Sequence, residues 1–358
     1  MPDRARTLAA LIECLRGTPP RNVDWMSVIA LANRSLTIAE LAVALRDAGD
    51  AIPADVQGYL QLILECNCER NRRLSAQLQE AVAALQQGGL EPLLLKGAVT
   101  LALGSEPRIA GRMLSDLDLM LAPADVPRAV ACLETLGYEL MFQANHPGAL
   151  LAARLSRPQD VGVIDLHQRL LLQSQLMRPG LDSYCSIAAS PLGKVLVPCP
   201  ALELLILVLH DQLHDGDYWT GRIELRHLLD MARLTKAPGS VDWDLLASLV
   251  PAKLTQNALE TQLVTMCRLV GGHVPSRMRN RLWTRVQHRR RMLQIRLPFT
   301  RVPFCLATLA AEAKNYPAHS ALAASARDRA PRPGKPAPIA RRMQRLRHLM
   351  TMPATSKL

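Results

Sequence analysis

The chain has few aromatic residues, which make up only 3% of its 358 positions. Aromatic side chains are enriched in strands, whereas Leu and Ala favour helices, so this composition argues against a β-sandwich. Apolar residues still account for 49% of the chain, far from the composition of a disordered protein. A length of 358 residues predicts two or three domains.

The sequence also lacks a cysteine framework and a long hydrophobic run. Its eight cysteines are scattered, and Cys66 and Cys68 lie on a helical pattern without metal-ligand spacing. The first residues form an amphipathic pattern with arginines rather than a secretory signal. The most apolar stretch, 201–209, is too short to span a bilayer and contains Glu203. We therefore expect reduced cysteines and a cytoplasmic location.

Positive charge is concentrated in the C-terminal quarter of the chain. The net charge is +12, and residues 277–301 contain nine Lys/Arg and no acidic residue. Residues 321–358 contain nine Lys/Arg and one acidic residue. Both segments are candidate contacts for an anionic partner, and a solvated basic helix is the alternative for 285–291.

Apolar residues recur every three or four positions over three N-terminal segments, which predicts helices. These segments are 7–16, 27–48 and 54–87. They would form an N-terminal helical region over 1–88, which we interpret as a scaffold. Helical patterns return over 200–315, the expected C-terminal helical domain. Beyond it, residues 316–358 are rich in Ala, Arg and Pro, which predicts a mobile tail.

The middle of the chain, 89–199, mixes short strand patterns with helix patterns. Strands are predicted at 93–95, 113–121, 138–142, 150–155 and 161–166, helices at 98–103 and 123–136, and a loop at 107–111. The last two strands form a hairpin across residues 157–160. This order predicts a small α/β domain with a mixed sheet.

Two aspartates, Asp116 and Asp118, stand inside the predicted strand 113–121. Residues i and i+2 of a strand point to the same side, so both carboxylates share one face. Asp165 lies in the strand 161–166 and becomes a third carboxylate if the two strands are neighbours. Such carboxylates repel unless a cation lies between them, and hard divalent cations bind them. The layout predicts a two-metal site for phosphoryl or nucleotidyl transfer, against the alternative of a solvated turn or helix cap.

A strand-to-helix turn at Lys96, Gly97 and Ala98 precedes the acidic strand. Backbone N–H groups of Gly97 and Ala98, at the start of a helix, could hold a phosphate, and glycine lets the backbone approach it. Lys96 would add positive charge there, although a surface lysine is the alternative.

Other polar residues flank these motifs. Arg112 is a candidate phosphate ligand or a solvated arginine. His167 shares the face of Asp165, where it could orient the acceptor or a carboxylate, with a structural histidine as the alternative. His210 and His214 lie one helical turn apart. We do not expect them to bind a metal, because no nearby carboxylate or cysteine completes a zinc set.

Four motifs occur in a characteristic order. They are LKGA at 95–98, RMLSDLDL at 112–119, LGY at 136–138 and IDLH at 164–167. In these residues the chain resembles the bacterial nucleotidyltransferase-family proteins of the DNA polymerase β-like superfamily, with Ala98 where the superfamily usually has Ser.

The resemblance implies an α+β fold, in which a small mixed-sheet nucleotidyltransferase domain over 89–199 is flanked by helical regions. It implies catalytic, metal-binding roles for Asp116, Asp118 and Asp165. It also implies a nucleotide-binding surface around the turn and its neighbours. That surface would comprise Lys96, Gly97, Ala98, Arg112, Ser115 and His167. The implied cofactors are Mg²⁺ (or Mn²⁺) and a nucleoside triphosphate, with ATP expected.

The expected function is transfer of a nucleoside monophosphate, AMP from ATP, to a hydroxyl or phosphate acceptor. The acceptor could be a peptide, a protein, a small molecule or a nucleic acid. The alternative is a degenerate, non-catalytic family member that binds nucleic acid or an acidic partner through its basic C-terminal quarter.

Overall fold

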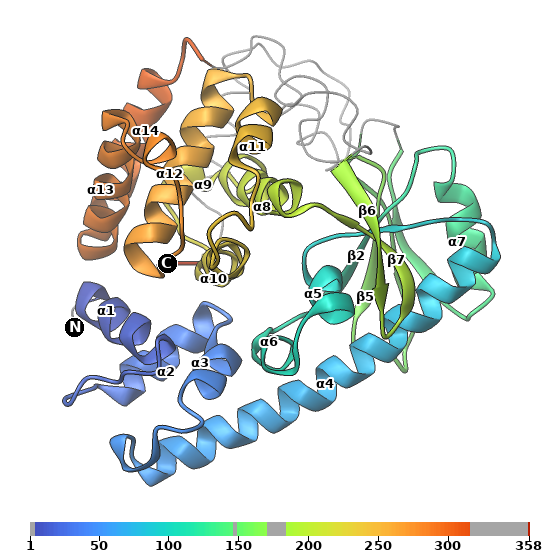
Figure 1. Cartoon of the computed structure of the whole chain (residues 1–358), viewed down its shortest axis with the longest axis horizontal. Coiled ribbons are helices and arrows are strands. Elements are labelled where there is room, and N and C mark those ends of the chain that lie inside the picture. The colour runs from blue at the N-terminus through green and yellow to red at the C-terminus, as the bar shows by residue number, and fades with distance from the viewer. Residues whose placement is uncertain (1–3, 146–148, 170–183, 316–356) are drawn as a thin grey trace. The chain divides into compact units, whose positions relative to one another are not determined.

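The structure, a computed structural model, describes residues 4–145, 149–169, 184–315 and 357–358. The predicted mobile tail therefore lies outside the described residues except for its last two. The described residues fall into two compact units (Figure 1). The sheet unit comprises those within 7–206, and the helical unit comprises 4–6 and those within 207–358.

The N-terminal region is helical, as predicted. Its elements are α1 (Arg4–Leu15), α2 (Trp25–Arg34), α3 (Ile38–Ala44), a 3₁₀ turn η1 (Gly49–Ala51) and α4 (Ala54–Gln87). The single helix predicted over 27–48 is wrong, because Leu36 adopts a positive φ of 53° that interrupts the helical backbone between α2 and α3. The bounds predicted for α4 are confirmed, and its C-cap is Gly88.

A seven-stranded mixed sheet forms the centre of the sheet unit. The elements that follow α4 are β1 (Leu93–Leu94), α5 (Gly97–Leu103), α6 (Glu106–Gly111), β2 (Asp116–Met120), α7 (Val126–Glu134), β3 (Glu139–Gln143), β4 (Leu151–Ser156), β5 (Val163–His167), β6 (Cys185–Ser190) and β7 (Gly193–Pro198). The strand order is β3-β4-β5-β2-β1-β7-β6. The pairs β1–β7 and β2–β5 are parallel and the others antiparallel, so the predicted α+β class with a mixed sheet is confirmed.

Two details of this region differ from the prediction. Residues 107–111, expected as a loop, belong to the helix α6, in which Pro107 occupies the first turn, where its missing N–H costs nothing. The hairpin β6–β7 was not predicted, because the half-exposed strand β6 lacks a clear apolar alternation. The predicted hairpin of β4 and β5 is confirmed.

The strands β2 and β5 place apolar and acidic side chains on opposite faces of the sheet. Leu117, Leu119, Ile164 and Leu166 are fully buried in a core shared with α4, α5 and α7. Because side chains alternate along a strand, the aspartates of β2 and β5 point to the other face. The apolar core thus fixes the register that brings these aspartates together.

The helical unit contains the rest of the described chain. Its elements are α8 (Pro200–Leu209, which begins in the sheet unit), a π-helical turn η3 (His210–His214), α9 (Asp217–Thr220), α10 (Leu225–Leu234), α11 (Trp243–Leu249), α12 (Lys253–Leu269), η4 (Ser276–Met278), α13 (Leu282–Arg296), η5 (Pro298–Thr300) and α14 (Arg301–Ala311). The helical prediction for 200–315 is therefore confirmed.

The basic helix α13 is only partly solvated. Arg291 is fully buried and donates to Gln262 Oε1 at 2.9 Å. Arg290 is 7% exposed and donates to the carbonyl oxygen of Tyr218 at 2.8 Å. The interpretation of 285–291 as a solvated basic helix is wrong for these two arginines, whose guanidinium groups form a polar core of the helical unit.

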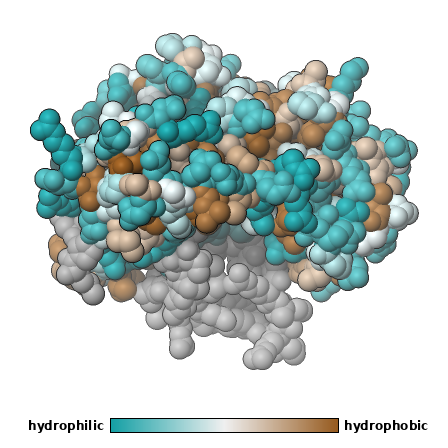
Figure 2. Space-filling model, turned by 90° about the horizontal axis from the view of Figure 1, so that it is seen from below, coloured by the Kyte–Doolittle hydropathy of each residue, from teal (hydrophilic) through white to brown (hydrophobic). Residues whose placement is uncertain are grey.

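Among the described residues, no helix is both long and apolar enough to cross a membrane. Figure 2 shows apolar side chains interspersed with hydrophilic ones on one face of the molecule.

Candidate active site

The carboxylates of Asp118 and Asp165 lie on neighbouring parallel strands in direct register. Both residues are buried, at 3% and 4% exposure. Asp116, two residues before Asp118 on the same face, is half-buried at the start of β2. The structure therefore brings the three predicted aspartates to one face of the sheet, at two adjacent strands.

Asp118 is held by two nitrogen-bearing side chains at the same oxygen. Lys96 Nζ lies 3.0 Å from Asp118 Oδ1, and His167 Nε2 lies 2.7 Å from the same atom. Burial alone would raise the pKa of Asp118, but Lys96 and His167 outweigh it and lower that pKa below its usual range. Asp118 is therefore an ionised carboxylate at neutral pH.

Asp165 is paired with Arg154, which was not among the predicted site residues. Arg154 Nε and Nη2 donate to the two oxygens of Asp165, both at 2.7 Å, because Arg154 faces Asp165 across the β4–β5 hairpin. The hydrogen bond to Asp165 raises the pKa of Arg154, and the charges of Asp165, Asp116 and Asp118 raise it further. Arg154 thus carries positive charge near all three aspartates. The signal in the sequence was a basic residue opposite an acidic one in the predicted hairpin.

The turn that carries Lys96 has an unusual backbone. Lys96 adopts φ 48° and ψ −116°, and the Ala98 N–H donates to the Leu95 carbonyl at 3.0 Å. This is the geometry of a type II′ turn, in which glycine normally occupies the position of Lys96. A non-glycine residue in such a region costs about 1–3 kcal/mol. Ala98 is fully buried and its N–H donates within the turn, while its phosphate contact stays a prediction.

Gly97 is required for packing rather than for a positive φ. A Cβ atom added at Gly97 would lie 2.3 Å from Leu114 Cδ2. Leu114 is buried just before β2. The glycine therefore lets α5 approach the segment that leads into the acidic strand.

The remaining predicted residues flank the aspartates. Arg112 is 3% exposed, so the alternative of a solvated arginine is wrong. Ser115 is exposed, and its Oγ lies 3.4 Å from Asp116 Oδ1. His167 contacts Asp118, which fits both the predicted orientation of a carboxylate and the alternative of a structural histidine. No distance to a nucleotide tests their predicted binding roles, which stay predictions.

Polar side chains of α4 donate hydrogen bonds to the backbone just before the strands β2 and β5. Arg70 Nε donates to the Leu114 carbonyl at 2.9 Å, and Arg70 Nη2 donates to the Val161 carbonyl at 2.8 Å. Gln77 Nε2 donates to the Gly162 carbonyl at 3.0 Å. Besides the scaffold role predicted for it, α4 therefore connects the segments immediately before β2 and β5.

Donor atoms of Asp118, Asp165 and His167 lie within 4.8 Å of one another, a group able to hold a metal ion. Carboxylate oxygens are the ligands that Mg²⁺ and Mn²⁺ prefer, so this donor set fits a hard divalent cation. Asp116 lies on the same face and would add a third carboxylate.

Two further groups of metal-ligand type lie in the helical unit. They are His210, His214 and Asp215, and His210, Asp211 and His227. The prediction that no carboxylate lies near His210 and His214 is therefore wrong. Asp211 and Asp215 directly follow His210 and His214 in the sequence, but the contact between Asp215 and His210 forms through the π-helical turn.

A mixed sheet with aspartates gathered on adjacent strands, beside a strand–turn–helix step, defines the chain as a transferase of the nucleotidyltransferase class. The model of a family described as uncharacterised nucleotidyltransferase matches residues 21–271. Since this match covers more than half of the chain, the protein belongs to that family, and the resemblance seen in the four motifs is confirmed.

Among solved structures, the chain is similar to the solution structure of the antibiotic-resistance factor ANT(2'')-Ia. The two are 14% identical, the similarity covers 49% of this chain and 88% of that one, and the TM-score is 0.35. A score this low does not establish a common fold. None of the curated proteins compared with the chain matches it.

Proposed function

We propose that the protein is a metal-dependent nucleotidyltransferase that moves a nucleoside monophosphate, AMP from ATP, to a hydroxyl or phosphate acceptor. One observation carries the proposal. Asp118 and Asp165 lie in register on adjacent parallel strands of a chain that belongs to a nucleotidyltransferase family.

The residues of this face have complementary roles in the proposed reaction. Asp116, Asp118 and Asp165 would hold Mg²⁺ or Mn²⁺, and the bound ion would neutralise charge on the triphosphate. Lys96 and Arg154 carry positive charge at the same face, where they would contact phosphate oxygens.

Bond changes in the proposed reaction are those of an in-line displacement. The acceptor oxygen forms a bond to the α-phosphorus, the bond to the bridging oxygen breaks, and pyrophosphate leaves. Asp165 would take the proton of an acceptor hydroxyl, and His167 would orient the carboxylate beside it. Peptide, protein, small-molecule and nucleic-acid acceptors are all compatible with this chemistry.

The test uses the full chain with each nucleoside triphosphate labelled at the α-phosphate, with Mg²⁺ or Mn²⁺. Pyrophosphate release is measured together with label on the protein itself, on RNA and on added peptides. Asp116→Asn should lower both pyrophosphate release and labelling. The decrease should exceed the ~10–100-fold that the loss of an outer-shell partner of a metal site typically causes. Asp116 is the suitable target because it is half-buried, so its replacement leaves the buried pairs of Asp118 and Asp165 in place.

Asp125→Asn is the matched control, because Asp125 is a half-buried aspartate that pairs with Arg128 in the same unit. Its activity should equal that of the unmodified chain. Full activity of Asp116→Asn with ATP and Mg²⁺, in a variant with an unchanged circular dichroism spectrum, would show that the assignment is wrong.

A hollow on α12 and α13 favours one alternative, an anionic partner for 277–301. Three arginines, Arg268, Arg285 and Arg289, line this hollow of about 250 Å³ together with Val264 and His288. Binding there should weaken steeply with salt, survive Asp116→Asn and be lost in an Arg285→Ala, Arg289→Ala double variant.

A further inference from the structure

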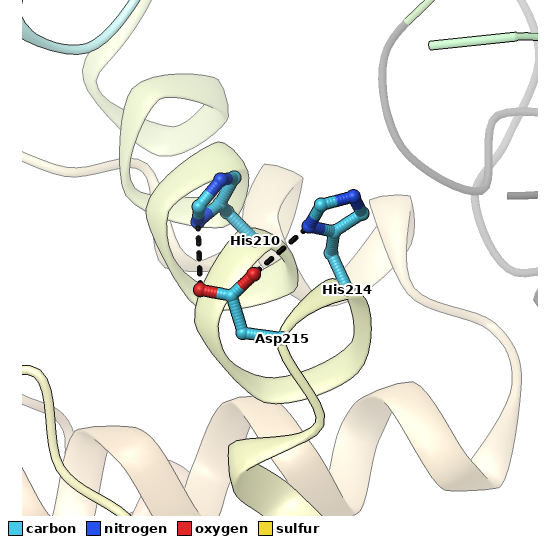
Figure 3. Close-up of side chains that lie close together, drawn as sticks. All are labelled: His210, His214 and Asp215. Atoms are coloured by element: carbon cyan, nitrogen blue, oxygen red, sulfur yellow. Dashed lines mark hydrogen bonds and ion pairs between the residues drawn. The ribbon is translucent and has the colours of Figure 1, made fainter. Parts of the chain in front are cut away.

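The side chains of His210, His214 and Asp215 converge within the helical unit. Figure 3 shows both imidazole rings beside the Asp215 carboxylate. Asp215 Oδ1 lies 2.9 Å from His214 Nδ1, and Asp215 Oδ2 lies 3.6 Å from His210 Nδ1. One ligand atom from each residue lies within 4.8 Å of the other two.

The π-helical turn η3 creates this convergence. The Asp215 N–H donates to the His210 carbonyl at 3.0 Å, a bond that spans five residues instead of the four of an α-helix. The wider turn brings residue 215 back over residue 210, while His214 stays beside both. Single π-turns within helices are rare and occur frequently at functional sites.

Near these three residues, two buried carboxylate oxygens accept no hydrogen bond from the described residues. Asp211 and Asp217 are fully buried, and Asp211 Oδ2 and Asp217 Oδ1 have no hydrogen-bond partner in the described part of the chain. His227 Nδ1 bonds to Asp211 Oδ1 at 2.7 Å. Lys357 Nζ lies 2.7 Å from Asp215 Oδ2 and 2.6 Å from Asp217 Oδ2. Buried carboxylates grouped in this way favour a bound cation.

We propose that His210, His214 and Asp215 bind a divalent transition-metal ion of the zinc class. Two imidazole nitrogens and one carboxylate oxygen are the protein ligands of open zinc sites, which leave the fourth position to water or another ligand. At zinc–ligand distances near 2.0–2.2 Å, tetrahedral ligand atoms lie about 3.4 Å apart. His214 Nδ1 and His210 Nδ1 lie 2.9 and 3.6 Å from different oxygens of the Asp215 carboxylate, so one ion between the rings and this carboxylate can be reached by all three side chains.

Solvent can reach the three ligands, whose side chains are 32%, 41% and 27% exposed in chain order. A metal ion would replace the Lys357 ammonium at Asp215, while Lys357 keeps its contact with Asp217. This site uses none of the residues of the proposed nucleotidyl-transfer site, and the proposal does not depend on that function.

The test is titration of the chelator-stripped full chain with Co²⁺, followed by displacement with Zn²⁺. Tetrahedral Co²⁺ gives intense ligand-field absorption bands. We expect these bands in the unmodified chain, without the thiolate charge-transfer band that binding at the exposed Cys66 and Cys68 would give. His214→Ala should weaken the Kd at least about tenfold, since the loss of outer-shell partners alone typically costs 10–100-fold.

Two further histidine variants make the result specific. His273→Ala is the matched control, because His273 is exposed in the same unit and should bind Co²⁺ like the unmodified chain. His167→Ala removes the histidine of the other candidate metal site and should also keep the bands. Bands that persist in His214→Ala, vanish in His167→Ala, or never form in the unmodified chain would overturn the proposal.

Lys357→Ala should change the Kd for Co²⁺ in the opposite direction to His214→Ala. Removing the competing ammonium should tighten the Kd for Co²⁺, because Asp215 would no longer be neutralised before the metal binds. A weaker Kd in this variant would contradict the role of Asp215 as a ligand.

Discussion

Arg70 of α4 should control the geometry of the acidic strands through the backbone that precedes them. Arg70→Met keeps the apolar stem of the side chain and removes both hydrogen bonds, to the carbonyls of Leu114 and Val161. A hydrogen bond from a charged donor contributes about 1.5–3 kcal/mol. The two bonds share one guanidinium and are not additive, so we expect a loss of roughly 2–4 kcal/mol in the free energy of unfolding.

Urea denaturation measures this loss, and Arg72→Met is the control on the same helix. Arg72 is 71% exposed and pairs with the exposed Glu69, so its replacement should leave the free energy of unfolding nearly unchanged. Under the proposed function, Arg70→Met should also lower turnover by about 10²-fold, because catalysis is sensitive to displacements near 1 Å. Equal stability and equal activity of the two variants would refute the positioning role of α4.

Three further substitutions probe packing and pH dependence. Gly97→Ala should cost about 1–3 kcal/mol in a thermal unfolding assay, because the new methyl group meets Leu114. A Cβ atom added at Gly58 meets nothing within 4 Å, so Gly58→Ala should instead stabilise α4 by roughly 0.5–1 kcal/mol. A stability change of the same sign in both variants would contradict this account. Burial, and then the charge of Arg291, lowers the pKa of His288 from 6.5 to about 4. The folded state therefore favours the neutral imidazole, and the stability that His288 contributes is present above pH 6.5 and lost as the pH falls toward 4. His288→Gln should abolish that loss, and an unchanged acid limb of the stability–pH curve would contradict the assignment.

Strand alternation was sufficient to predict which face carries the aspartates. In β2 and β5 every second residue is a Leu or Ile that belongs in a core, and this period leaves Asp118 and Asp165 on the opposite face. That the two strands lie side by side was a hypothesis from the sequence, and the parallel β2–β5 ladder confirms that they are neighbours. The helix α4 was predictable for the same reason, because its period of 3.6 residues ends at a glycine cap.

Features that depend on long-range contacts were not predictable from local patterns. Arg154 and Asp165 meet because of the register of a hairpin, which the sequence fixes only loosely. Arg290 and Arg291 are charged residues that a local pattern assigns to solvent, yet in the core they donate to carbonyl and amide oxygens from other helices. The π-helical turn that aligns Asp215 with His210 has no sequence signature of its own.

The contacts of Lys96 are hard to explain by stability alone. A buried ion pair is often no more stabilising than an apolar pair of the same size, because desolvation offsets the attraction. Lys96 and Asp118 form such a pair, at 14% and 4% side-chain exposure, and the Lys96 backbone adds strain of about 1–3 kcal/mol. A fold selected for stability would place glycine at this turn and an apolar residue on the strand. Strain of this kind concentrates at functional sites, so its position beside Asp118 and Asp165 supports the proposal that nucleotidyl transfer takes place on this face of the sheet.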